Sequence, residues 1–201
     1  LQGIMAELEA RKQILLAVGY QPVTKAEDIA LVPMAKHQLM DEFLADHPTG
    51  RQLEKAAAPM TVTIDYAHSD DFEKKYRVAT ALAPAFAALF DNTAMWGGEE
   101  YTGFCGTTKL RNESNKKITY VPGVLTDGNY KFNQYADMIT KMPAVAVAQG
   151  EEIVSAGDKT NEEVFGDRDV TTDEIIGMLN MCQADVRATE QGIELRMVDS
   201  L

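Results

Sequence analysis

The chain has 201 residues and a formal net charge of −12, with 45% hydrophobic and 25% charged residues. This composition is ordinary for a globular protein with one sizeable core. The acidic balance argues against a nucleic-acid partner, because phosphate backbones bind basic surfaces. No apolar run approaches the roughly 18 residues that span a bilayer, and no signal-peptide pattern opens the chain. We therefore expect a cytoplasmic protein with no membrane partner.

The first third of the chain predicts two helices and one short strand. Apolar residues recur at helical spacing over 4–10 and 35–45. The apolar run 14–18, which ends at Gly19, predicts a short strand. The sequence His-Pro-Thr-Gly at 47–50 is typical of a turn, so we expect the second helix to end there.

A strand followed by a long helix is the clearest prediction. Residues 60–66 alternate apolar and polar side chains, which is the pattern of a strand with one buried face. A helix is then predicted to run to about Phe90, because apolar side chains recur every three or four residues. Ser69 or Asp70 is placed to cap its N-terminus, where acidic residues also suit the helix dipole.

The second half mixes long irregular stretches with short elements. Residues 93–127 show no sustained period and predict a long loop, which in a compact domain is often functional. Thr171 and Glu174 have the spacing of a capping box before a helix. The other expected elements are a helix over 132–142, a strand over 144–147, a polar excursion over 150–166 and a closing strand over 193–199. Without regular βαβ alternation, we expect an α+β fold: an antiparallel sheet flanked by helices, in one domain covering 1–201.

Charged residues on two of the predicted strands are candidates for a site. Glu194 and Arg196 are two residues apart, so both point to one face of the closing strand. There a carboxylate can help to hold a divalent cation, and a guanidinium can grip a carboxylate or phosphate. Asp65 shares a strand face with Thr61 and Thr63. In each case the alternative is a solvated strand face without function.

Four basic residues fall within the long loop of this otherwise acidic chain. They are Lys109, Arg111, Lys116 and Lys117. Such a group is suited to neutralise phosphate charge during phosphoryl transfer, and the alternative is a solvated run of charge. The three histidines, His37, His47 and His68, stand apart, and we expect surface or capping roles. The two cysteines, without a CxxC pair, indicate neither a zinc site nor a disulfide scaffold.

Laid end to end, these pieces resemble the glutamate–cysteine ligases of plants and bacteria. The Gly-Tyr-Gln-Pro at 19–22 is similar to the end of an early strand in that family. The alternating strand at 60–66 is followed by a helix with the family's Lys, Arg, Leu, Pro and Ala-Leu-Phe spacing. The closing Ile-Glu-Leu-Arg-Met-Val-Asp at 193–199 resembles the family's Ile-Glu-x-Arg-x-x-Asp strand. Further similar stretches are Pro-Met-Ala-Lys to Met40 at 33–40, the helix ending in Met-Pro at 132–143, and Val-Arg at 186–187.

The resemblance implies part of a glutamine-synthetase-like fold. It implies an ATP- and Mg²⁺-dependent carboxylate–amine ligase that joins the glutamate γ-carboxylate to the cysteine amine through γ-glutamyl phosphate, as in glutathione biosynthesis. The chain would be the central and C-terminal part of the catalytic domain, and an N-terminal segment or partner chain would complete the site. The implied site residues are Arg196, Lys109 and Arg111 as catalytic groups, Thr61, Thr63, Asp65 and Arg187 as substrate-binding groups, and Glu194 as a metal ligand.

Two departures from the family pattern keep other hypotheses open. Ala56 and Ala57 stand where the family has Arg-Thr, and residues 106–110 read Gly-Thr-Thr-Lys-Leu in place of its Arg-Ser-His-Ile-Trp. These changes favour the alternative of a ligase-fold protein without catalysis that acts as a binding or interaction subunit. A third hypothesis is a related ligase that joins a different amine to glutamate, with its acceptor pocket shaped by residues 93–122.

Overall fold

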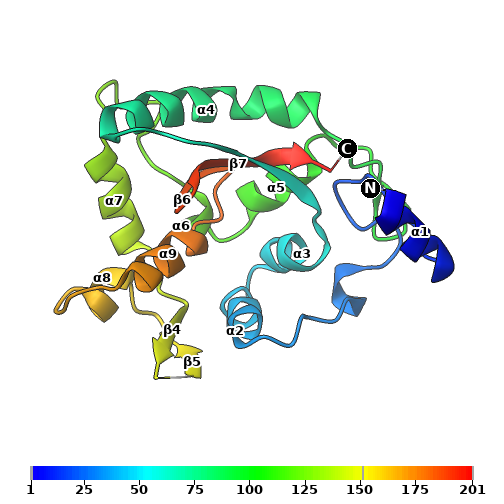
Figure 1. The fold of residues 1–201 in the computed structure, drawn as a ribbon, viewed down its shortest axis with the longest axis horizontal. Helices are drawn as coiled ribbons and strands as arrows, with labels where there is room; N and C mark the ends of the chain where they lie inside the picture. Colours follow the sequence, from blue (N-terminus) through cyan, green and yellow to red (C-terminus); the bar gives the residue numbers. More distant parts are fainter. Residues whose placement is uncertain (1, 151, 201) are drawn as a thin grey trace.

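The computed structural model describes residues 2–150 and 152–200 and has the predicted α+β character, with small antiparallel sheets flanked by helices (Figure 1). None of the described helices is long and apolar enough to cross a membrane. The helices are α1 (Gln2–Ala10), the 3₁₀ helix η1 (Ala26–Asp28), α2 (Ala35–Phe43), α3 (Pro48–Ala56), α4 (Ser69–Leu89), α5 (Gly106–Glu113), α6 (Lys116–Thr119), α7 (Phe132–Lys141), α8 (Asn161–Phe165) and α9 (Thr172–Met181). The strands are β1 (Pro59–Ile64), β2 (Met95–Trp96), β3 (Glu99–Glu100), β4 (Ala146–Gln149), β5 (Glu152–Ser155), β6 (Val186–Thr189) and β7 (Gly192–Asp199).

The main sheet is a three-stranded antiparallel sheet in the order β1-β7-β6. The strand β7 is therefore central, and it pairs with β1 although more than 120 residues separate them in the chain. The tight turn between β6 and β7 depends on Gly192, which has a φ of +142°. A Cβ there would lie 2.4 Å from the carbonyl oxygen of Ile64. Only glycine lets the hairpin approach β1 this closely.

The long helix α4 covers one face of this sheet (Figure 1). Its buried side chains recur every three or four residues, as the sequence predicts, and form one stripe: Phe72, Tyr76, Ala79, Ala83 and Ala87. The cap of this helix corrects a prediction. His68, rather than Ser69 or Asp70, accepts a hydrogen bond from the backbone N–H of Asp71.

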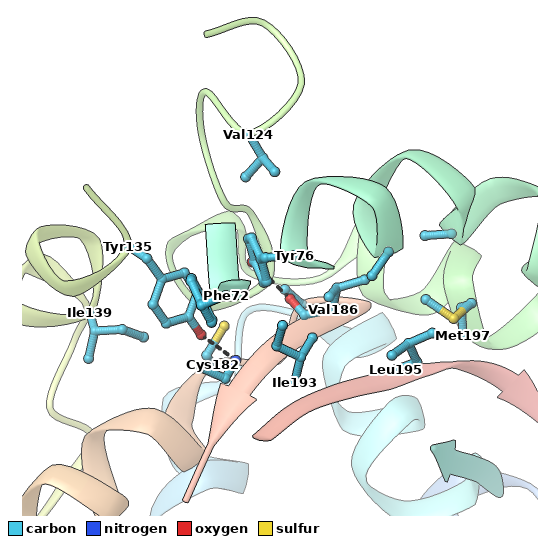
Figure 2. Close-up of a cluster of buried hydrophobic side chains, with 14 of the residues drawn as sticks. Phe72, Tyr76, Val124, Tyr135, Ile139, Cys182, Val186, Ile193, Leu195 and Met197 are labelled. Carbon is cyan, nitrogen blue, oxygen red and sulfur yellow. Dashed lines mark hydrogen bonds between the residues drawn. The ribbon is translucent and has the colours of Figure 1, made fainter. Parts of the chain in front are cut away.

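Aromatic side chains of α4 and α7 fasten the helices to the sheet (Figure 2). Phe72 and Tyr76 stack, with ring centroids 5.1 Å apart, and Tyr135 packs edge-on against both. The Tyr76 hydroxyl donates to the carbonyl of Val186 at 3.0 Å. The backbone N–H of Ala188 donates to the Tyr135 hydroxyl at 2.8 Å. The buried core therefore carries two polar contacts that fix where β6 lies against the helices.

Replacing Tyr76 with phenylalanine tests the first of these contacts. The substitution keeps the ring packing but removes the donor that satisfies the buried Val186 carbonyl, so we expect unfolding to become easier by about 1–2 kcal/mol. Chemical denaturation measures this change. Tyr120→Phe is the matched control, because Tyr120 is 59% exposed, and its effect should stay within about 0.5 kcal/mol. Equal effects from the two variants would contradict the proposed role of the hydroxyl.

The predicted strand over 14–18 is wrong. This segment has no regular secondary structure and pairs with no described strand, and Ile14, Leu15 and Leu16 are 77%, 59% and 48% exposed. A strand exists only where a neighbour accepts and donates its backbone hydrogen bonds. The nearest pairing is a single bridge between Tyr20 and Ala57. Local hydrophobicity therefore predicted an element that the described tertiary structure does not form.

Three segments expected to be irregular contain regular structure. The predicted turn at 47–50 opens α3, because Pro48 occupies the first helical turn, where its missing N–H costs nothing. The predicted loop 93–127 contains β2, β3, α5 and α6. The polar excursion 150–166 contains β5 and α8, and α8 begins with a capping box between Thr160 and Glu163. Residue 151 of that excursion lies outside the described residues. The strand expected over 144–147 is shifted and begins at Ala146.

Candidate functional site

The sheet face opposite α4 carries a row of polar side chains. In the register, Arg187 of β6 faces Glu194 of β7, which in turn faces Thr63 of β1. Side chains of directly opposed residues lie on the same face of a sheet. Arg196 lies two residues further along β7, so the predicted shared face of Glu194 and Arg196 is confirmed. The sequence spacing thus predicted that Glu194 and Arg196 share a face, and the pairing of β6 with β7 brings Arg187 to the same face.

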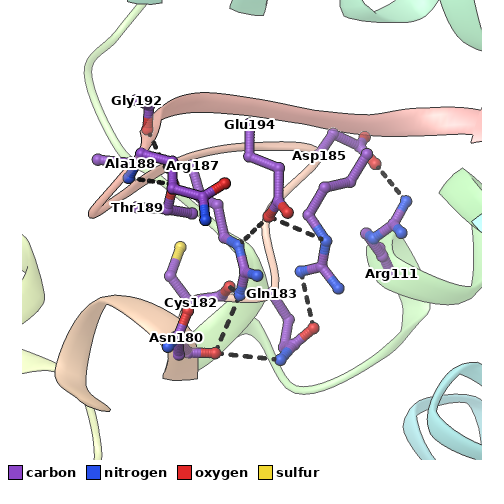
Figure 3. A network of polar contacts seen from close by, with 12 residues as sticks. Arg111, Asn180, Cys182, Gln183, Asp185, Arg187, Ala188, Thr189, Gly192 and Glu194 are labelled. Carbon is purple, nitrogen blue, oxygen red and sulfur yellow. Dashed lines mark hydrogen bonds and ion pairs between the residues drawn. The ribbon is translucent and has the colours of Figure 1, made fainter. Parts of the chain in front are cut away.

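A network of ion pairs joins Arg187, Glu194 and Arg196 (Figure 3). The Glu194 carboxylate accepts from Nε of Arg187 at 2.5 Å and lies 3.8 Å from Nε of Arg196. Nη1 of Arg187 also donates to the backbone carbonyls of Asn180 and Cys182, each at 3.0 Å. These contacts hold the Arg187 guanidinium rigidly and engage one oxygen of Glu194.

A third arginine reaches this region from α5. Arg111 is 1% exposed, and its Nη1 lies 3.0 Å from a carboxylate oxygen of Asp185, just before β6. Asp185 also accepts the backbone N–H of Arg196 through its carbonyl. Nε and Nη2 of Arg111 and Nε of Arg196 are buried without a hydrogen-bond partner. Unpaired donors of this kind are costly in a protein interior.

The cluster brings three buried or half-buried arginines together. Arg111, Arg187 and Arg196 lie against the carboxylates of Asp185 and Glu194, and the buried Asp199 carboxylate also acts on Arg111. Burial and repulsion from the other two arginines lower the pKa of Arg196 to about 9. Burial also lowers the pKa of Arg111, although Asp185 opposes that shift. An anion bound in the cleft beside Arg187 and Arg196 would interact favourably with their charge.

The cluster opens onto a cleft of about 790 Å³, within the range for small-molecule sites. Arg187 and Arg196 line one part of it. The cleft runs between α2 and α3 on one side and α9 with the β4–β5 hairpin on the other (Figure 1). Gln183 also lines it and accepts from Nη1 of Arg196 at 2.8 Å. The remaining polar lining residues are Lys36, His37, Glu54, Asn161, Thr171, Asp173, Glu174 and Asn180.

The structure separates several of the other predicted site residues from this cleft. Thr61 and Thr63 are exposed on β1, and the Asp65 side chain is fully exposed, 3.9 Å from Lys75. Lys109 is exposed on α5, and its Nζ lies 5.9 Å from the centre of the Tyr101 ring. These four residues do not line the cleft that contains Arg196.

The four basic residues predicted to cluster in the long loop do not form one patch. Arg111 points into the interior toward Asp185, whereas Lys109 on the same helix is exposed. Lys116 and Lys117 lie on the separate helix α6, where both are exposed. The reason is helical: residues 109 and 111 are about 200° apart around α5. Only Arg111 joins the arginine cluster.

Metal binding by Glu194 has limited support among the described residues. No group of three His, Cys, Asp or Glu side chains in residues 2–150 and 152–200 is placed to hold a metal ion. One oxygen of Glu194, Oε2, already bonds Arg187. A divalent cation takes several oxygen ligands, so these residues do not by themselves fit a magnesium site.

Four residues in or near the cleft were missed by the sequence analysis: Gln183, Asp185, His37 and Glu54. Asp185 and Gln183 precede β6, and only the path of the chain brings them to Arg111 and Arg196. His37 was expected to have a surface or capping role, but it lines the cleft and contacts Glu54 of another helix. His68 has the predicted capping role. No spacing rule could have joined His37 to Glu54, which is seventeen positions away.

The chain is similar in sequence to several glutamate–cysteine ligases. The chain is 25% identical to the chloroplastic glutamate–cysteine ligase of Arabidopsis thaliana over 129 residues, which are 64% of this chain and 25% of that protein. It is 25% identical to glutamate–cysteine ligase EgtA of Mycolicibacterium smegmatis over 72% of this chain and 34% of that protein. It is 23% identical to the chloroplastic glutamate–cysteine ligase A of Oryza sativa subsp. japonica over 69% of this chain and 28% of that protein. No family model matches the chain.

The chain is thus distantly similar to glutamate–cysteine ligases. The matched residues cover about a quarter to a third of the length of these relatives.

Proposed function

We propose that this chain carries part of the active site of an ATP-dependent carboxylate–amine ligase that joins the glutamate γ-carboxylate to the amine of cysteine. The observation that carries the proposal is the arginine cluster, of which Arg187 and Arg196 line a cleft of small-molecule size. Distant similarity to glutamate–cysteine ligases from plants and a bacterium supports the substrate assignment. Anionic substrates and a phosphorylated intermediate are the ligands that such a cluster favours.

The reaction has two chemical steps. The γ-phosphoryl group of ATP passes to the γ-carboxylate of glutamate, which gives an acyl phosphate and ADP. The amine of cysteine then attacks the acyl carbon, so that the C–N bond forms, the C–O bond to phosphate breaks, and inorganic phosphate and a proton leave. Both steps develop or transfer negative charge, and fixed cationic donors stabilise it without reorganising.

Arg196 is assigned the direct role and its neighbours supporting roles. Its guanidinium lines the cleft, so it is suited to bond the phosphate or carboxylate oxygens of a ligand. Gln183 accepts a hydrogen bond from Nη1 of Arg196, and Arg187 donates a hydrogen bond to the neighbouring Glu194. Arg111 contributes positive charge from within. Mg²⁺ would neutralise ATP phosphate charge, but the described residues do not form its site.

The test is ATP turnover by the complete protein with Mg²⁺ and L-glutamate, with and without L-cysteine. We expect phosphate release that depends on both amino acids, together with a γ-glutamylcysteine product identified by mass spectrometry. Replacing cysteine by other amines examines the alternative of a different acceptor. No phosphate release from a folded protein under any of these conditions would refute the ligase assignment.

A second candidate function is anion binding without catalysis. The observation in its favour is the ion pair of Glu194 with Arg187, since it engages a carboxylate that a metal-dependent ligase would use. Calorimetry distinguishes the two functions. Binding of ATP or glutamate without turnover supports the non-catalytic role, whereas binding with turnover supports the ligase.

A further inference from the structure

A histidine–carboxylate pair stands in the same cleft as the arginines, on the side formed by α2 and α3. Nδ1 of His37 lies 3.1 Å from Oε1 of Glu54. The two side chains are 30% and 24% exposed, so both remain accessible from the cleft that they line. The pair joins two helices, and neither residue caps a helix. This placement is unlike the surface or capping role expected from sequence.

The contact with Glu54 determines which ring nitrogen is available. A carboxylate accepts hydrogen bonds, so in the neutral ring Nδ1 carries the proton that is donated to Glu54. Nε2 then carries the free lone pair and is the basic atom. A base held in one tautomer by a carboxylate is the arrangement found where a side chain takes a proton from a nucleophile.

The cleft is lined by both acidic and basic side chains, and His37 contacts one of the acidic ones, Glu54. Lys36 comes from α2, Glu54 from α3, and Asp173 and Glu174 from α9, while the β4–β5 hairpin contributes apolar side chains to the lining. Glu174 is already paired with Arg168. Arg187 and Arg196 supply the cationic part. A ligand with an ammonium group toward the carboxylates and an anionic group toward the arginines matches this distribution.

We propose that His37, oriented by Glu54, is the general base that deprotonates the ammonium of the incoming amine substrate. This role rests on the proposed ligase function. Nε2 of His37 takes one proton from the ammonium, which frees the nitrogen lone pair. The lone pair attacks the acyl carbon, phosphate leaves with the electrons of the C–O bond, and the proton on His37 passes to solvent. Glu54 is the positioning residue, because it acts through the imidazole.

His37→Gln in the complete protein tests this role with two nucleophiles. With cysteine, whose amine is mostly protonated at neutral pH, we expect kcat to fall about 100-fold, the lower end of general-base effects. With hydroxylamine, which is largely unprotonated at neutral pH, glutamyl hydroxamate formation should stay within about threefold of the wild type. Glu54→Gln keeps a hydrogen-bond acceptor but loses the charge, so its cysteine-dependent kcat should fall by a smaller factor.

The control is His47→Gln, because His47 lies between α2 and α3 and does not line the cleft. It should leave both reactions unchanged. A pH profile adds a second readout, since the acidic limb of kcat/KM with cysteine should change shape in His37→Gln and keep its shape in the control. Thermal unfolding checks that the variants fold. If His37→Gln does not fold, Glu54→Gln provides the test.

The outcomes separate the two proposals. Cysteine-dependent turnover of His37→Gln within about threefold of the wild type would overturn the general-base role, as would equal loss with cysteine and hydroxylamine, which indicates a structural role. Wild-type protein that forms no hydroxamate and releases no phosphate would overturn the ligase function itself, and the role of His37 with it. Selective loss of the cysteine reaction supports both.

Discussion

Replacing Arg196 with methionine is expected to lower glutamate-dependent ATP turnover at least 100-fold, a barrier increase of about 2.7 kcal/mol. The guanidinium lines the cleft and is suited to bind the anionic ligand, whereas methionine fills similar space without charge. Steady-state phosphate release measures the effect. Turnover within about threefold of the wild type would show that Arg196 is not catalytic.

The same substitution should not unfold the chain. The pKa of Arg196 is lowered to about 9 by burial and by Arg187 and Arg111, so the guanidinium is still charged at neutral pH and its charge destabilises the folded state. Removing that charge relieves the repulsion. We therefore expect Arg196→Met to keep or raise the Tm of the ligand-free protein.

Inorganic phosphate provides a second measurement on the arginine cluster. An anion that binds only the folded state raises the Tm, so phosphate should stabilise the wild type and have little effect on Arg196→Met. Arg11→Met is the control, because Arg11 forms an exposed ion pair with Glu7 on α1. It should keep both the turnover and the response to phosphate. Equal stabilisation of all three proteins by phosphate would contradict anion binding at Arg196.

Replacing Asp199 with alanine is expected to cost roughly 3–5 kcal/mol of unfolding free energy. Asp199 ends β7 and is 2% exposed. Its carboxylate accepts hydrogen bonds from the backbone N–H of Asn92 at 2.9 Å and from the hydroxyls of Thr93 and Thr107 at 2.8 Å. Alanine would leave these three groups without their acceptor in the interior. Denaturant unfolding monitored by circular dichroism measures the loss.

Two further variants define the cause of this destabilisation. Asp199→Asn retains one acceptor oxygen in the same place, so its cost should be clearly smaller than that of alanine. Asp46→Ala is the control for loss of an acidic residue, because Asp46 is exposed, and its effect should be within about 0.5 kcal/mol. If Asp199→Ala is as mild as Asp46→Ala, the carboxylate does not hold β7 to the segments around Thr93 and Thr107.

Elements with a strong local period followed from the sequence. The helical period of α4, the position of strand β1 and the shared face of Glu194 and Arg196 all depend on residues a few positions apart. The buried face expected for β1 is wrong, because Met60 and Val62 are 41% and 43% exposed. Such patterns have geometric consequences that hold whatever the rest of the chain does. The capping box at Thr171 likewise placed the start of α9 correctly, since its two hydrogen bonds lie within four residues.

Features that depend on partners far away in the chain could not be predicted from the sequence. The run 14–18 has the composition of a strand, yet no described strand pairs with it, and Ile14, Leu15 and Leu16 stay exposed. Arg111 looked like one of four loop cations, and its burial is set by helix α5 and by Asp185, 74 residues further along. Its charge is compensated only because β6 brings that carboxylate to it.

The sequence by itself determined the α+β class, the long helix, the strands β1 and β7, and the side of β7 on which its charged residues point. Only the tertiary structure decided that three arginines share one site, that Lys109 and Asp65 stand outside its cleft, and that His37 meets Glu54. The physical reason is range. Periodicity and capping act over one or two turns, whereas a buried charge cluster forms only where packing brings separate helices and strands together.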